Sequence, residues 1–302
     1  MGGKQLRLFL VDGTPGGLTT LEITNWTGRL VGASRSDLHD LLKRDEAQRP
    51  GIYLLLGDDP EAIEGQRLYV GETDEIRGRL RQHNDSTRGK DFWTRVVIVT
   101  SKDDNLTKAH TRYLESRLVT IATAAKRCTL ENNTSPGTPT LPEADVSDME
   151  YFIDQLHIAL PVLGLNVLRG AATPTLAKSA PDALSPIFAL TIPKRGIAAR
   201  AQQIDGEFTV LEGSTVAGDF AANEIYADST KASYAAYRAQ HAKLVADGSI
   251  VVNGATGSVT RDVRFPSPSA AGAIVSGRSC NGRKEWESSD GLSFGAWEDR
   301  DL

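Results

Sequence analysis

The sequence predicts an α+β fold, in which a small central sheet flanked by helices is followed by a second small α+β domain. Short apolar runs of strand length alternate with longer segments whose apolar residues recur at helical spacing. Residues 169–193 are rich in Ala, Pro, Ser and Thr, which is typical of an exposed linker. The 302 residues, 40% of them hydrophobic, are enough for two separate cores.

The N-terminal segment predicts a β-hairpin followed by a helix. Leucines alternate weakly with other side chains over residues 5–11, and residues 18–26 follow a turn rich in glycine. Residues 36–46 carry leucines on one side of a helix. We expect these elements to cover an edge of the sheet that the next segment forms.

Two tripeptides anchor the predicted sheet. Gly51-Ile52-Tyr53 opens one apolar run, and Tyr69-Val70-Gly71 closes another. The polar segment between them, residues 58–66, can turn the chain back, so the pattern predicts a β-hairpin with a long connection. Residues 96–100, Val-Val-Ile-Val-Thr, predict a buried central strand.

The helix predicted after the hairpin has two polar residues on its buried stripe. Thr73 is the expected N-cap, and Asp74 and Glu75 would occupy the first turn, where the helix dipole favours them. The inward stripe consists of Ile76, Arg79, Leu80 and His83. An arginine and a histidine on such a stripe cost free energy unless they meet partners or a ligand, so the exception indicates a functional site.

A long helix is predicted from Asn105 or Thr107 to about Lys126. Glu115 lies beside its apolar stripe. A single carboxylate in such a place suits Mg²⁺, whose other ligands would be water and substrate phosphate. The alternative is a salt bridge from Glu115 to Arg112 or Arg79.

A basic segment interrupts an acidic chain. The net charge of -5 and the pI near 5.6 argue against a surface that is basic throughout, so a nucleic-acid site must be local. Residues 77–95 contain six basic side chains against two aspartates. This segment is either a phosphate-binding surface or an ordinary solvated helix face and loop. Its candidate nucleic-acid contacts are Arg77, Arg81, Arg88 and Lys90.

Cysteine usage and hydropathy suggest a compartment. Cys128 and Cys280 lie far apart without a metal-binding spacing, which favours a reducing environment over a zinc site. We find no pattern of a signal peptide and no apolar run of membrane-spanning length. We therefore expect a cytoplasmic protein with no membrane partner.

The C-terminal third predicts a second α+β unit. Strands are expected over residues 208–214, 250–252 and 261–265, with a helix over residues 232–247. A further helix should begin after Ser267, because a serine followed by proline is typical of a helix N-terminus.

Taken together, the two tripeptides and the residues after them resemble the catalytic domain of the GIY-YIG nuclease family. Six positions recur in order: Tyr53, Tyr69, Arg79, His83, Glu115 and Asn132. The resemblance implies a divalent-metal-dependent endonuclease that hydrolyses phosphodiester bonds of DNA. Asn133 also fits the last position, but alignment on Pro136 favours Asn132.

The resemblance also implies a role for each side chain. A hairpin tyrosine would be the general base; we prefer Tyr53, with Tyr69 as its partner, although the reverse has been argued for family members. Arg79 and His83 would contact the phosphate or shape the nucleophile, and Glu115 would hold one Mg²⁺ (or Mn²⁺). The alternative hypothesis is a catalytically idle nucleic-acid-binding or scaffolding protein.

The C-terminal part resembles a domain of unknown function that often follows GIY-YIG nucleases. The strings 265–271 and 277–282 and Trp286 carry this resemblance, and no catalytic constellation accompanies them. The expected organisation is therefore an N-terminal β-hairpin and helix packed on the nuclease core (residues 1–48), a nuclease domain (49–168), a linker (169–195) and a C-terminal α+β domain with DNA targeting as its candidate role (196–302).

Overall fold

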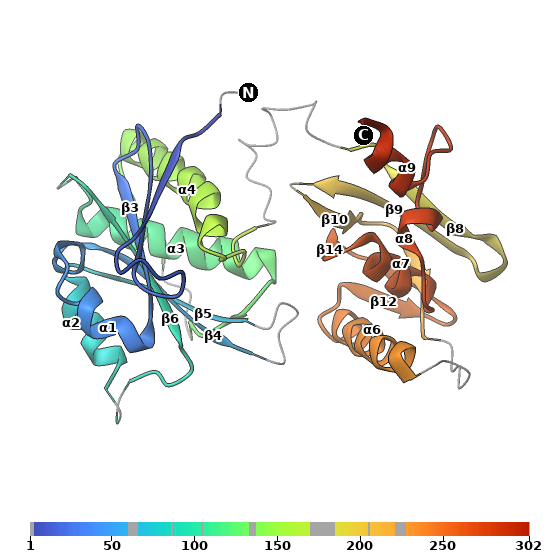
Figure 1. Ribbon diagram of the computed structural model, residues 1–302, viewed down its shortest axis with the longest axis horizontal. Helices are drawn as coiled ribbons and strands as arrows, with labels where there is room; N and C mark the ends of the chain where they lie inside the picture. Colours follow the sequence, from blue (N-terminus) through green and yellow to red (C-terminus); the bar gives the residue numbers. More distant parts are fainter. Residues whose placement is uncertain are drawn as a thin grey trace. The chain divides into compact units, whose positions relative to one another are not determined.

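The computed structural model divides the chain into two compact units, Met1–Ser179 and Ala180–Leu302 (Figure 1). Each unit is mixed α/β and has its own sheet, as the sequence predicts. The structure describes residues 3–59, 66–85, 87, 89–103, 105–132, 137–169, 185–204, 206–220 and 228–301, without the side chains of 228–234 and 301.

In the described part of the first unit, seven strands form one sheet in the order β1-β2-β3-β6-β4-β5-β7. All neighbours are antiparallel except β5 and β7. The strands are β1 (Leu6–Leu10), β2 (Thr19–Ile23), β3 (Gly28–Ser34), β4 (Gly51–Asp58), β5 (Gln66–Thr73), β6 (Arg95–Ser101) and β7 (Thr129–Leu130).

Helices cover both faces of this sheet. Because successive side chains of a strand alternate, Ile52 and Leu54 pack with α3 and α4, whereas Tyr53 and Leu55 pack with α1 and α2. The helices are α1 (Leu38–Leu41), α2 (Ile76–His83), α3 (Lys108–Ala125), α4 (Glu143–Val162) and the 3₁₀ turns η1 (Arg35–Asp37) and η2 (Asp45–Gln48).

The N-terminal segment differs from its prediction. The β1–β2 hairpin forms, but the chain continues into β3, a strand that was not predicted. β3 pairs with β6 over its whole length, so the segment extends the sheet instead of covering its edge. Two glycines in Gly28–Ser34 weaken the strand pattern, and pairing on both sides supplies the stability that propensity lacks. The helix predicted over residues 36–46 is only four residues of α-helix between 3₁₀ turns.

Helix starts were predicted with mixed success. The β5 ladder runs on to Thr73, which pairs with Gly51, so Thr73 is not the N-cap of α2. Glu75 holds that position without a side-chain cap, and its N–H donates to the Thr73 hydroxyl at 3.2 Å. Thr107 does cap α3, where it accepts the His110 N–H.

The second unit is built on a second sheet. In its described residues β12, β13, β11, β9, β10 and β14 are adjacent in that order, while β8 pairs with β9 and β15 with β8. The strands are β8 (Phe188–Ile192), β9 (Ile197–Ile204), β10 (Glu207–Val210), β11 (Thr215–Ala217), β12 (Ile250–Asn253), β13 (Thr256–Val259), β14 (Val263–Phe265) and β15 (Glu287–Ser288). The helices are α6 (Asp228–Ala246), α7 (Pro268–Ser276), α8 (Gly282–Glu285), α9 (Phe294–Glu298), η4 (Pro193–Arg195) and η5 (Asp299–Asp301).

The predicted linker, residues 169–195, ends too late. β8 lies inside that range and pairs with β9 along its length, with Phe188 fully buried. Its surroundings are rich in Pro and Ala, which hid a short strand from pattern reading. The linker residues 170–184 lie outside the described part of the chain.

The α7 cap agrees with the sequence, and the helix packs beside a buried tryptophan. The Ser267 hydroxyl accepts the Ala270 N–H at 3.1 Å, and Pro268 begins the helix. Trp286 is buried, and its indole N–H donates to the Pro268 carbonyl at 3.0 Å. Among the described helices, none has both the length and the apolar character needed to cross a bilayer.

Candidate active site

Three aromatic rings meet on the α2 face of the first sheet. The β4–β5 register sets Tyr53 opposite Gly71 and Leu55 opposite Tyr69, so both tyrosines point to this face. The ring centroids of Tyr53 and Tyr69 are 6.2 Å apart, and His83 of α2 lies 5.4 Å from Tyr53 and 5.3 Å from Tyr69. The hairpin and the helix together therefore assemble the cluster.

Gly71 is required by this packing. A Cβ at that position would lie 2.3 Å from both Cζ and the hydroxyl oxygen of Tyr53, closer than atoms can approach. The absence of a side chain lets the Tyr53 ring lie over the β5 backbone. The last glycine of the second tripeptide thus fixes the position of the tyrosine in the first.

The Tyr53 hydroxyl is held by both polar residues of the α2 stripe. It lies 2.9 Å from His83 Nε2, and Arg79 Nε donates to it at 3.3 Å. Arg79 also donates to Gln82 through Nη1 at 2.8 Å. Arg79 and His83, the two polar residues on the apolar stripe of α2, therefore share the Tyr53 hydroxyl as a partner, as the sequence predicts.

Burial keeps the Tyr53 hydroxyl and the His83 imidazole neutral at pH 7. Burial raises the pKa of Tyr53 well above its usual value, with a smaller contribution from Tyr69, and the Arg79 hydrogen bond only partly opposes it. Burial, together with the charges of Arg79 and Lys90, lowers the pKa of His83 to about 4. The unprotonated imidazole of His83 can therefore accept a hydrogen bond from the Tyr53 hydroxyl.

Glu115 of α3 is a half-buried carboxylate near the same cluster. Burial and the charge of Glu72 raise the pKa of Glu115 to about 6, while Arg112 and Arg79 lower it. Within the described chain, however, neither arginine is an ion-pair partner of Glu115. The salt-bridge alternative is therefore not what the described residues form, and Arg79 acts electrostatically on both Tyr53 and Glu115.

Residues 49–118 match the family model of the GIY-YIG catalytic domain. The first unit carries a GIY-YIG nuclease domain. Residues 188–298 match a domain of unknown function, DUF4357, which places this domain C-terminal to the nuclease domain. No curated protein and no solved structure matches the chain. A GIY-YIG catalytic domain indicates an endonuclease family, and a nuclease domain implies a nucleic-acid substrate.

Glu72 is a neighbour of this site that sequence reasoning missed. Its charge raises the pKa of Glu115, and its carboxylate accepts from Lys108 Nζ at 3.0 Å and from the Thr111 hydroxyl at 3.2 Å. Strand alternation could have found it, because Glu72 shares the α3 face of β5 with Val70.

Asn132 supports β5 and does not contact the tyrosines. Its Oδ1 accepts the Val70 N–H at 3.0 Å and its Nδ2 donates to the Val70 carbonyl at 2.8 Å. This side chain replaces a partner strand beyond the two-residue β7, between Tyr69 and Gly71. Asn133, the other candidate, lies outside the described residues.

The predicted nucleic-acid contacts fall in two places. Lys90 Nζ lies 4.3 Å from the centroid of the Tyr69 ring, at the site. Arg77 and Arg81 lie on a different flank of α2 from Arg79, because two residues turn a helix by about 200°. Arg88 is outside the part of the chain that the structure describes.

His110 has a structural position near the start of α3. The Thr107 N–H donates to its Nδ1 at 3.3 Å, and its Nε2 lies 3.4 Å from Asp145. It completes the capping box of the helix and is not a buried core histidine.

The donor set fits one hard divalent cation. The described residues contain no cluster of three or more His, Cys, Asp or Glu side chains that could enclose a metal. Glu115 is instead a single carboxylate that burial and Glu72 hold in an unfavourable ionised state. A cation of the Mg²⁺ type, which keeps several waters, would relieve that state.

Glu115→Gln is expected to stabilise the metal-free protein at neutral pH. The pKa of Glu115 is raised from 4.5 to about 6, so the free energy of unfolding falls as the pH rises from about 4.5 to about 6 and keeps the lower value above that. The free energy of unfolding falls by about 2 kcal/mol at most. Glutamine has no charge and avoids this decrease. The variant should therefore be more stable than the wild type by about 1–2 kcal/mol at pH 7.5 and gain little at pH 4.5, as measured by urea unfolding.

Glu150→Gln supplies the opposite control. A hydrogen bond from Arg117 lowers the pKa of Glu150, so this substitution should destabilise the protein at pH 7.5. A Glu115→Gln variant that is less stable than the wild type at both pH values would contradict the interpretation that burial and Glu72 disfavour the ionised form of Glu115.

Proposed function

We propose that this protein is a divalent-metal-dependent endonuclease that hydrolyses phosphodiester bonds of DNA. One observation carries the proposal: a buried tyrosine hydroxyl bonded to both His83 and Arg79, near the half-buried carboxylate of Glu115. Hydrolysis requires a base for the attacking water, donors for the phosphoryl oxygens and charge for the leaving oxygen. The cluster has a residue suited to each task.

Tyr53 acts as the base through a proton relay. Because burial keeps its hydroxyl protonated, Tyr53 must release its own proton as it accepts the proton of water. The unprotonated Nε2 of His83, 2.9 Å away, receives that proton. The water oxygen then bonds to phosphorus, the bond from phosphorus to the leaving oxygen breaks, and solvent protonates the leaving oxygen. Tyr69 remains the alternative base on the same face.

Arg79 binds a phosphoryl oxygen beside this relay. A guanidinium has five N–H donors, and Tyr53 and Gln82 accept from two of them. The remaining donors can bind the phosphoryl group, whose negative charge grows in the transition state. Glu115 would hold Mg²⁺ (or Mn²⁺), which when bound supplies charge stabilisation for the phosphoryl and leaving oxygens.

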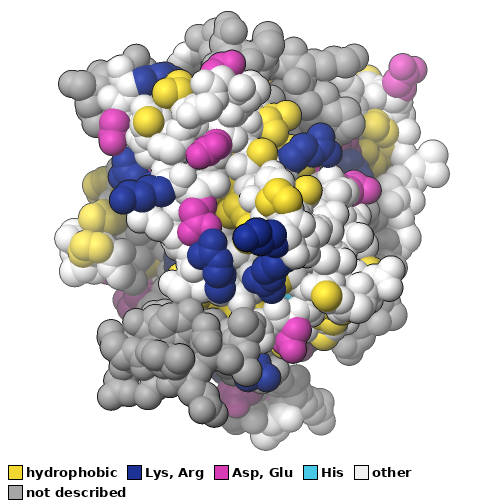
Figure 2. Space-filling model, turned by 90° about the vertical axis from the view of Figure 1, so that its right-hand side faces the viewer, with side chains coloured by type: hydrophobic (Ala, Val, Ile, Leu, Met, Phe, Trp, Pro, Cys, Tyr) yellow, Lys and Arg dark blue, Asp and Glu magenta, His cyan; other side chains and the backbone are white. Residues whose placement is uncertain are grey.

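The C-terminal unit is proposed to bring the nuclease domain to DNA. Figure 2 shows one face of this unit, on which Lys and Arg side chains gather near the middle. Lys194, Arg200 and Lys284 are exposed basic residues of the unit, and Arg195 donates to the Ser276 carbonyl. Such side chains suit a phosphate backbone.

Plasmid nicking tests the function. We expect Mg²⁺ to support nicking of supercoiled plasmid and EDTA to abolish it. Glu115→Gln should reduce the rate at least about 100-fold, because the amide lacks the charge that attracts a hard cation. The exposed Glu143→Gln should match the wild type. Wild-type protein that binds DNA but never nicks it would favour the idle binding protein, and a folded Glu115→Gln variant active at saturating Mg²⁺ would exclude the metal role.

Tyr53→Phe should slow single-turnover cleavage by about 10²–10⁴-fold and leave the DNA dissociation constant within about twofold, because the relay acts only in the transition state. The rate would be measured by quenched flow or gel assay and the affinity by anisotropy in EDTA. Tyr151→Phe, at an exposed position on α4, is the matched control. A larger rate loss in Tyr69→Phe would transfer the base role to Tyr69.

A fragment ending at Leu168 should keep Mg²⁺-dependent nicking but bind DNA at least tenfold more weakly. The first unit has its own sheet and core, so removal of the second leaves its packing intact. Affinity would be compared by anisotropy with the full chain. Unchanged affinity in a folded, active fragment rules out targeting, and aggregation of the fragment indicates that the second unit completes the fold.

A further inference from the structure

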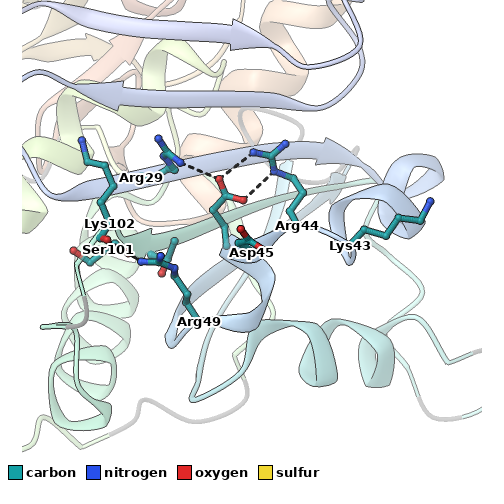
Figure 3. Close-up of a pocket in the computed structure, with 9 residues that line it drawn as sticks. Arg29, Lys43, Arg44, Asp45, Arg49, Ser101 and Lys102 are labelled. Atoms are coloured by element: carbon teal, nitrogen blue, oxygen red, sulfur yellow. Dashed lines mark hydrogen bonds and ion pairs between the residues drawn. The ribbon is translucent and has the colours of Figure 1, made fainter.

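A basic hollow of about 640 Å³ lies at the ends of β3 and β6, on the sheet face that also carries Tyr53 (Figure 3). It is lined by five basic side chains and two acidic ones, Asp45 and Glu46. The basic residues are Arg29, Lys43, Arg44, Arg49 and Lys102. We call it the Arg29 hollow.

The guanidinium groups of the hollow are fixed by partners inside the protein. The Glu46 carboxylate, itself buried, accepts from Arg29 Nη1 at 3.2 Å and from Arg44 Nε and Nη2 at 3.0 Å each. Arg49 Nη1 donates to the carbonyls of Ser101 and Lys102 at 2.8 and 2.9 Å. Groups held in this way lose little conformational entropy when a ligand arrives.

The hollow has more basic than acidic side chains, and two of the basic ones, Lys43 and Lys102, can exchange their ion-pair partners for a ligand. Figure 3 shows Lys43 and Lys102 extending outward at opposite ends of the hollow. Their ion pairs, to Asp40 at 2.7 Å and to Glu22 at 3.2 Å, are partly exposed and worth little, so a phosphate can replace them. Arg29 Nε is a buried donor without a partner in the described structure. In a chain of net charge -5, the hollow is a local focus of positive potential.

The hollow lies close to the tyrosine cluster. Arg29 of β3 pairs with Thr100 of β6, which pairs with Gly51 of β4. Gly51 is two residues before Tyr53 on β4, so both positions belong to the same face of the sheet. Strand spacing places Arg29 and Tyr53 about 12 Å apart at Cα. Duplex DNA advances about 3.4 Å per base pair, so this distance corresponds to about four base pairs.

Further basic side chains lie on α2, the helix that neighbours the hollow. η2, which contributes Asp45 and Glu46, packs against α2. Arg77 and Arg81 lie on the flank of α2 away from Arg79, which points to Tyr53. A chain of phosphates, rather than one small anion, suits positive charges distributed in this way.

We propose that the Arg29 hollow binds backbone phosphates of the DNA a few nucleotides from the bond that the tyrosine cluster cleaves. This inference rests on the proposed function and adds a second contact to it. Arg29, Lys43 and Arg44 come from the segment before residue 49, where the match to the GIY-YIG domain begins. The N-terminal strands thereby lengthen the DNA-binding surface of the domain.

The test is DNA binding by the full-length double variant Lys43→Glu/Lys102→Glu, measured by anisotropy in EDTA at several salt concentrations. On a 20-base-pair duplex we expect at least tenfold weaker binding at about 100 mM salt. The slope of log affinity against log salt should fall by about two, because two phosphate contacts are lost.

The matched control is Lys4→Glu/Arg95→Glu, which changes the net charge equally on the other sheet face. Lys4 bonds to Gln155 of α4 and Arg95 to the Leu163 carbonyl. Should charge reversal unfold the test variant, judged by circular dichroism, Lys43→Gln/Lys102→Gln replaces it, with about threefold weaker binding and the same change of slope expected.

Each outcome separates the two proposals. Wild-type protein that fails to bind DNA contradicts the proposed function itself. Wild-type binding with an equal loss in test and control variants, or with no loss in the test variant, overturns the phosphate role of the hollow alone. Competition by a free mononucleotide that matches competition by the duplex, molecule for molecule, also overturns it in favour of a small-anion site.

Discussion

The contact between Tyr53 and Gly71 determines the geometry of the candidate active site. It requires one register of the β4–β5 hairpin, because a slip by one residue would send Tyr53 to the other face of the sheet. It also requires a glycine, since any side chain would displace the ring. α2 is then held against the same face by Ile76 and Leu80, which brings Arg79 and His83 to the tyrosine hydroxyl.

Burial is the common cause of the unusual protonation states at the site. It raises the pKa of Tyr53 and Glu115 and lowers that of His83, in each case by disfavouring the charged form. Arg79 opposes the first two shifts and adds to the third. The unfavourable ionisation of Glu115 and the buried Tyr53 hydroxyl are tolerated because the apolar core on both faces of the sheet stabilises the fold around them.

The N-terminal strands extend the sheet of the first unit, whereas the sequence predicted that they would only cover its edge. β3 pairs with β6, so the first three strands become part of the central sheet. This pairing aligns Arg29 with Thr100 and creates the hollow beside the site. A segment with no catalytic residue of its own thus contributes charge to the surface that surrounds the tyrosines.

The sequence by itself determined the fold class, the hairpin and the six candidate positions, and it limited the start of α3 to Asn105 or Thr107, because periodicity and caps are local and the tyrosine motif has a fixed order. The conflict between an apolar stripe and the polar Arg79 and His83 already indicated the site. Only the tertiary structure decided that Glu72 neighbours Glu115, that β3 and β8 are strands, and that Thr73 ends a strand instead of capping a helix. Those features depend on pairing and packing between distant segments, whose free energy outweighs weak local propensity.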